Sequence, residues 1–248
     1  MEPADNTREG KDLIARISAA VKELGLDPKF TELAEMITQD QKPGLKTAFL
    51  FSNTRDNQQS VFEGAANLYR EGRTGSFLVI GSDDDTTGFP GYTKWATGLE
   101  EVVGPDIRGR IMRVPLLPMR RNGQRNINNK SESESLGAYA TAKKIGALYA
   151  VAWNVQQLRA FMTAASEVMD QSLELNIFNQ LGATLPWGDV VYHSQGSDRG
   201  TREDFVRREL IKIAGYQADG DIKPASDVIS YMRQRTIPLQ ATLLPSIG

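Results

Sequence analysis

The sequence predicts a parallel α/β sheet with helices on both faces. Between residues 46 and 170, four short apolar runs (46–51, 76–80, 111–117 and 148–153) alternate with stretches of helical periodicity. Polar clusters follow the first, second and fourth runs directly, and a basic loop separates the third run from its cluster. Repeated strand, polar loop and helix are typical of a parallel sheet, in which ligands bind at the carboxyl ends of the strands. The sequence therefore predicts where a site lies.

Residues 1–45 are expected to form a helical appendage to this sheet. Apolar side chains recur at helical spacing over residues 7–25. A second helix is expected from Pro28 to Thr38, because proline at a first helical position lacks an N–H group that would have no partner there. Residues 39–45 are expected to be a linker.

A main domain is expected over residues 46–216. Its first strands are apolar throughout, as expected when helices cover both faces of a sheet. The helices between and after them are expected at 58–71, 91–103, 133–145 and 156–171.

The remainder of the chain has a less regular pattern. Residues 173–185 fit either a short helix or a pair of strands, and Val190–Tyr192 is expected to be a fifth strand. A helix is expected over 202–216, with Thr201 or Ser197 at its cap and with Ile211 among its inward apolar residues.

Residues 217–248 are expected to be a C-terminal extension. Its helix is expected over 226–235, capped by Ser226. The apolar, proline-broken tail that follows is expected to pack along the domain or to join a partner chain in a homo-oligomer.

The composition excludes several classes of protein. The formal net charge of −2 argues against broad nucleic-acid binding, which needs a basic surface. The absence of cysteine excludes disulfides, thiolate nucleophiles and cysteine-based metal sites. His193 is the only histidine, so acid–base chemistry is expected to rest mainly on carboxylates, tyrosines or lysines.

The chain shows no pattern of a membrane or secreted protein. Its acidic, polar start does not have the features of a signal peptide, and no apolar run approaches the ~20 residues of a membrane span. We therefore expect a cytoplasmic protein without a membrane partner.

Short motifs occur in a fixed order along the main domain. They are a Leu-Tyr-x-x-Gly turn at 68–72, a strand ending in Gly-Ser at 81–82, a glutamate-bearing helix start at 131–136, an Arg-Ala pair at 159–160 and a last helix at 201–216. In this order the chain resembles the domain family that includes the SanA, ElyC and YdcF proteins, which are small Rossmann-like domains.

The resemblance implies a Rossmann-like fold and a nucleotide-like ligand, with S-adenosylmethionine as the candidate cofactor. Two features depart from the family pattern. Its glycine-rich first loop is replaced by residues 52–57, and its histidine three residues before Arg159 is replaced by Gln156. A backbone without glycines does not approach a pyrophosphate closely, so an NAD site of the G-x-G-x-x-G type is not expected.

Polar residues near the strand ends are the candidates for the cleft. The expected cofactor-binding residues are Asn53, Asp83, Asp85, Trp153, Asn154 and Arg159. Each also has a structural alternative: helix capping or a solvated loop for the polar residues, core packing for Trp153, and an ion pair with Glu132 or Glu134 for Arg159. As ligand contacts, the aspartates suit ribose hydroxyls or a divalent metal, and Trp153 suits stacking on an adenine ring.

Glu134 and His193 are the expected catalytic residues. Glu134 is expected near a helix start, where it serves as a general base or completes a capping box with Ser131. Arg120, Arg121 and Gln156 are the expected substrate-binding residues, with the two arginines on a loop suited to closing over an anion.

These residues predict a small-molecule enzyme or binding protein with a nucleotide-like ligand. One alternative is a hydrolase or transferase for a phosphorylated or sugar-linked substrate, with a carboxylate base and a divalent metal. A second alternative is a non-catalytic assembly protein that associates through the tail at 239–247.

Overall fold

The computed structural model describes residues 6–41, 43–82, 89–120, 123, 127–193 and 197–236. Its main sheet has five parallel strands in the order β3-β2-β1-β4-β5. Their bounds are β1 Thr47–Leu50, β2 Ser76–Ile80, β3 Ile111–Val114, β4 Ala147–Ala152 and β5 Asn176–Leu181. This arrangement confirms the predicted Rossmann-like α/β fold.

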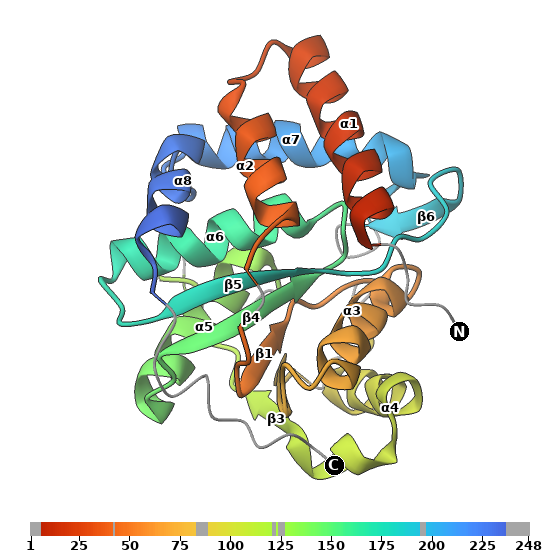
Figure 1. Cartoon of the computed structure of the whole chain (residues 1–248), viewed down its shortest axis with the longest axis vertical. Helices are drawn as coiled ribbons and strands as arrows, with labels where there is room; N and C mark the ends of the chain where they lie inside the picture. The colour runs from red at the N-terminus through yellow and green to blue at the C-terminus, as the bar shows by residue number, and fades with distance from the viewer. Residues whose placement is uncertain are drawn as a thin grey trace.

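Helices cover both faces of the sheet (Figure 1). Right-handed crossovers place α3 (Gln58–Arg70) and α4 (Tyr92–Val103) on one face, and α5 (Asn129–Lys143) and α6 (Gln157–Asp170) on the other. Accordingly α3 packs on α4, and α5 packs on α6. A short 3₁₀ helix, η1 (Pro105–Arg110), leads into β3.

The two ends of the chain come together beyond β5. Helix α1 (Asn6–Leu24) packs on α2 (Lys29–Thr38) and on α7 (Arg202–Ala218), while α2 also contacts α8 (Ala225–Gln234) and β5 (Figure 1). One continuous cluster of buried apolar residues runs from these helices into the sheet. The tail at 237–248, including the predicted association segment 239–247, lies outside the described residues.

Val190–Tyr192 forms a strand, as predicted, but it is not the fifth strand of the main sheet. Val190–Tyr192 belongs to β6 (Val190–His193), which pairs antiparallel with β7 (Asp198–Thr201) in a separate hairpin. Burial alternates along β6, so one of its faces is open, whereas a central parallel strand is covered on both faces. The fifth strand of the sheet is β5, whose buried Asn179 and Gln180 obscure its apolar pattern.

Several predicted helix starts and faces also differ from the structure. Helix α5 begins at Asn129 rather than at 133, and its capping box joins Asn128 to Ser131 instead of Ser131 to Glu134. At α8 the N-cap position is Pro224, without a side-chain hydrogen bond, instead of Ser226.

On α7 the predicted cap is confirmed, since the Thr201 side chain accepts a hydrogen bond from the Asp204 N–H group. Ile211, however, is exposed, because the buried stripe of this helix includes Phe205, Glu209 and Ile213. Within the part of the chain that the structure describes, none of the helices combines the length and apolar character needed to cross a bilayer.

Candidate functional site

A cavity of about 260 Å³ opens at the carboxyl ends of β1 and β4. The chain passes outward through β1, β2 and β3 and then returns to the other side of β1 as β4, so the strand order reverses between β1 and β4. Ligands of doubly wound sheets bind at such a reversal. Ser52, Asn53 and Thr54 line the cavity after β1, and Gln156 and Arg159 line it after β4.

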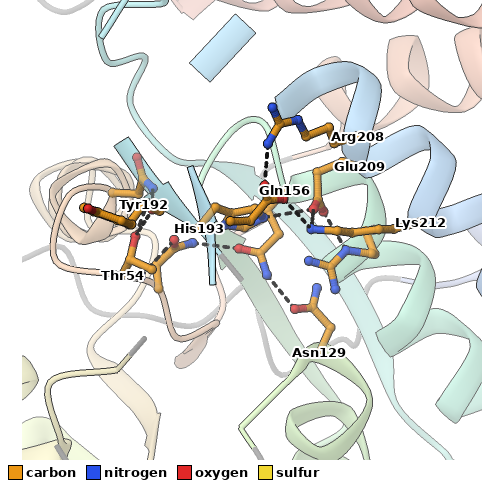
Figure 2. A network of polar contacts seen from close by, with 12 residues as sticks. Thr54, Asn129, Gln156, Tyr192, His193, Arg208, Glu209 and Lys212 are labelled. Atoms are coloured by element: carbon orange, nitrogen blue, oxygen red, sulfur yellow. Dashed lines mark hydrogen bonds and ion pairs between the residues drawn. The ribbon is translucent and has the colours of Figure 1, made fainter. Parts of the chain in front are cut away.

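A chain of three side-chain amides crosses one wall of this cavity. The Asn53 Nδ2 atom donates to Gln156 Oε1 at 2.7 Å, and Gln156 Nε2 donates to Asn129 Oδ1 at 2.5 Å. Figure 2 shows Gln156 between the β1 loop and Asn129. Gln156 therefore positions the loop after β1 against the first turn of α5.

Glu132 is the buried carboxyl group of the site. Its side chain lies in the first turn of α5, is 1% exposed and accepts a hydrogen bond of 2.7 Å from the backbone N–H group of Ser52. Burial raises the pKa of Glu132 to about 8, against the lowering effects of the Ser52 hydrogen bonds and the positive charge of Arg159. The carboxyl is therefore mostly protonated at neutral pH.

A second buried carboxyl, Glu209 of α7, holds three cationic or titratable groups together (Figure 2). Arg159 Nε lies 2.5 Å from Glu209 Oε2, and His193 Nε2 and Lys212 Nζ lie 2.9 and 3.3 Å from Glu209 Oε1. Burial alone would raise the pKa of Glu209, but the charges of Arg159 and His193 hold it well below its usual range. Glu209 is therefore ionised where Glu132 is protonated.

Four of the predicted site residues meet in the cavity: Asn53, Gln156, Arg159 and His193 all line it. The His193 ring packs edge-on against Trp153, with the ring centroids 5.2 Å apart.

Two other predicted residues lie away from the cavity. Trp153 is fully buried in the core and has no surface on which an adenine ring can stack. Asn154 donates to Thr184 Oγ1 at 3.1 Å and does not line the cavity.

Glu134 also faces away from the cavity. It accepts a hydrogen bond of 3.2 Å from the backbone N–H group of Arg120, whose guanidinium pairs with Glu167 at 2.8 Å. Positions two apart on a helix differ by about 200° in direction. Because Glu132 points toward β1, Glu134 points to the opposite side of the helix.

The remaining predicted ligand residues, Asp83, Asp85 and Arg121, lie outside the described residues. Among the residues that are described, no group of three or more histidine, aspartate or glutamate side chains is placed to hold a metal ion.

Sequence reasoning missed much of the cavity wall. It did not assign roles to Asn129, Lys212 and Tyr216, and it favoured Glu134 over Glu132. Glu209 had a usable signal, because it stands between Phe205 and Ile213 at helical spacing and so interrupts an apolar stripe with a charge.

A second cavity of about 190 Å³ adjoins the first. The two share Asn128, Asn129, Arg159 and Tyr216 in their walls. Phe89 and Tyr216 provide aromatic surfaces in the first cavity.

The chain was compared with protein-family models, with curated proteins and with solved structures, and none of them matches it.

Proposed function

We propose that this chain is a small-molecule enzyme in which Glu132 transfers a proton to or from a nucleotide-like ligand bound between β1 and β4. The observation that carries the proposal is that Glu132 lines the cavity and is buried there, and this burial raises its pKa to about 8. A general acid or base works best when its pKa lies near the working pH, and enzymes raise the pKa of a glutamate by burial.

The purely structural role of Glu132 is to accept the Ser52 N–H group and so join α5 to β1. A glutamine would perform that role equally well and would not incur the cost of burying an ionisable group. The presence of a carboxyl at this position therefore supports a role in proton transfer over a purely structural role.

The lining of the two cavities favours a ligand with more than one kind of chemical group. Two adjoining cavities, aromatic side chains and the cations Arg159 and Lys212 suit a molecule with a ring at one part and charged groups at another. S-adenosylmethionine is the first candidate, since the chain resembles the SanA, ElyC and YdcF family, and a transferase reaction is the first to test. Gln156, at the place of the family histidine, would position the ligand without transferring a proton.

A thermal-shift screen tests the ligand part of the proposal. The purified protein is heated with S-adenosylmethionine, S-adenosylhomocysteine, ATP, NAD or sugar nucleotides, each with and without magnesium. A ligand at 100 times its dissociation constant stabilises the fold by about 2.7 kcal/mol, which gives a clear shift. No shift with any of these compounds would contradict a nucleotide-like ligand.

The pH profile of turnover tests the role of Glu132. With a compound that binds, we expect the rate of the wild type to change around pH 8 and Glu132→Gln to lose both this dependence and most of the rate. Glu101→Gln, which changes an exposed glutamate of α4, is the control for the loss of one carboxyl. A Glu132→Gln enzyme with the wild-type rate and profile would exclude proton transfer by Glu132.

A further inference from the structure

The chain of amides leaves one buried hydrogen-bond donor facing the cavity. Because Asn129 Oδ1 accepts from Gln156, the orientation of the Asn129 amide is fixed. Its Nδ2 atom has no hydrogen-bond partner among the described residues, although the Asn129 side chain is only 3% exposed. An unpaired buried donor is costly, so a ligand acceptor is the expected partner at this position.

Asn179 shows what the same arrangement looks like when its role is structural. Its Oδ1 atom accepts from Gln157 Nε2 at 2.5 Å, just as Asn129 accepts from Gln156. The Asn179 Nδ2 atom, however, donates to the backbone oxygen of Ile37 at 3.0 Å. The missing partner therefore distinguishes the asparagine that lines the cavity from the one in the core.

The donor lies at the amino end of a long helix. Asn129 is the first residue of α5, whose cap is supplied by the neighbouring Asn128 side chain, so the Asn129 side chain is not needed for capping. The first N–H groups of a helix lack intrahelical partners, and the helix dipole makes its amino end attractive to anions.

The charges around the cavity favour an anion as well. Arg159 and Lys212 line the cavity, and both pair with Glu209 behind it. Glu132, the carboxyl that lines the first cavity, is mostly protonated at neutral pH because burial raises its pKa. Lys212 also lies 3.7 Å from Asp198, and neither Asp198 nor Glu209 lines the first cavity, whereas both cations do.

We infer that the first turn of α5, with the Asn129 amide and the cation Lys212, binds an oxyanion group of the ligand, either a phosphoryl group or a carboxylate. Asn129 lines both cavities, so the oxyanion lies where they meet. This inference rests on the proposed small-molecule site and names the group by which the ligand is held.

The test is a titration of the whole protein with inorganic phosphate and with acetate at constant ionic strength, followed by the backbone amide signals of Asn129 and Lys130 in NMR spectra. We expect saturable shifts of these signals with at least one of the two anions. Tighter binding of phosphate would indicate a phosphorylated ligand, and tighter binding of acetate would indicate a carboxylate such as that of S-adenosylmethionine.

Asn129→Asp is the informative variant. It keeps an oxygen acceptor for Gln156 and places a negative charge at a helix amino end, where the dipole favours it, so the fold should persist. The same charge repels an oxyanion, and we expect the dissociation constant to rise about tenfold or more. Asn67→Asp makes the same change of charge on α3, outside both cavities, and is expected to bind like the wild type.

Absence of saturable shifts with both anions would overturn the inference, as would equal binding by the wild type and Asn129→Asp. Either result would leave the role of Glu132 standing, because that role is judged separately by the pH profile of Glu132→Gln.

Discussion

Glu132 and Glu134 are two residues apart and have different surroundings. The Glu132 carboxyl accepts the N–H group of Ser52 after β1 and feels the positive charge of Arg159. Glu134 instead accepts the backbone N–H group of Arg120. Since a titrating group couples proton binding to folding, the raised pKa of Glu132 is also a statement about stability.

Glu132→Gln should alter how stability depends on pH. The folded pKa of about 8 lies above the ordinary value of 4.5, so the carboxyl stabilises the fold fully below pH 4.5 and this stabilisation is lost as the pH rises through 8. The variant keeps an acceptor for the Ser52 N–H group and does not titrate. We expect its free energy of unfolding, relative to the wild type, to rise by roughly 3–5 kcal/mol between pH 5 and pH 8.

Urea unfolding at a series of pH values measures this difference. Glu101→Gln, on the exposed side of α4, should follow the wild type at every pH. Parallel curves for Glu132→Gln and the wild type would contradict the raised pKa.

The Glu209 cluster is expected to be the most sensitive ion pair at the site. Glu209→Gln removes the partner of Arg159, a side chain that is itself buried. A buried charge left without its partner typically costs about 3–5 kcal/mol, and we expect a loss of that size in urea unfolding.

Two further variants test the assignment of this loss. Glu203, like Glu209, lies on α7, but it is an exposed partner of Arg16 of α1. Glu203→Gln should therefore change stability little. Arg159→Met added to Glu209→Gln should recover part of the loss, because it removes the unpaired charge. A double variant less stable than Glu209→Gln would argue against an unpaired Arg159 as the cause.

At the scale of an element, the start of α5 determines which side chains reach the cavity. The Asn128–Ser131 capping box fixes the first helical residue at Asn129 and turns Glu132 toward β1. The serine-rich sequence 131–135 offers other starts, and the observed start at Asn129 is the one that brings the Glu132 carboxyl to the cavity.

Asn128→Ala should destabilise the protein by about 1 kcal/mol, since it removes the side-chain acceptor for the Ser131 N–H group. It should also weaken ligand binding, because the cap positions the first turn of α5, which carries Asn129 and Glu132. Ser226→Ala is the control: Ser226 looks like a cap of α8 in the sequence, but it supplies no capping bond in the structure. Urea unfolding of both variants decides whether the cap lies at Asn128.

At the scale of the whole molecule, an ion pair holds the segments after α2 and α8 against the edge strand β5. Arg235, after α8, pairs with Asp40, after α2, and its guanidinium lies over the Phe178 ring of β5. Asp40 also accepts a hydrogen bond of 2.7 Å from the Asn179 N–H group, so β5 does not present a free edge here.

Arg235→Met should therefore loosen the packing of α2 and α8 on β5. It leaves Asp40 buried without its cation, and we expect a loss of about 3–5 kcal/mol in urea unfolding. The matched control is Arg233→Met, because Arg233 pairs with Glu32 of α2 on the exposed surface and should matter little. Equal effects of the two variants would show that burial of the Asp40–Arg235 pair is unimportant.

The sequence determined the parallel sheet, its first four strands and the end of the sheet where the site lies. These follow from local periodicity, because a short apolar run bounded by polar residues is typical of a buried strand. Residues directly after a strand, such as Asn53 and Gln156, could be placed for the same reason. The strand β5 could not, because two buried polar residues interrupt its apolar pattern, and one of them, Asn179, acquires its side-chain partners only from α2 and α6.

Only the tertiary structure decided which titratable groups gather at the cavity. Glu132, Arg159, Glu209 and Lys212 come from three helices, and their contacts depend on the start of α5 and the packing of α7 behind the cavity. The pKa of Glu132 in particular follows from burial, which no local pattern contains. The physical reason is that desolvation and ion pairing are set by side chains far apart in the sequence, whereas strands and helices are set by near neighbours.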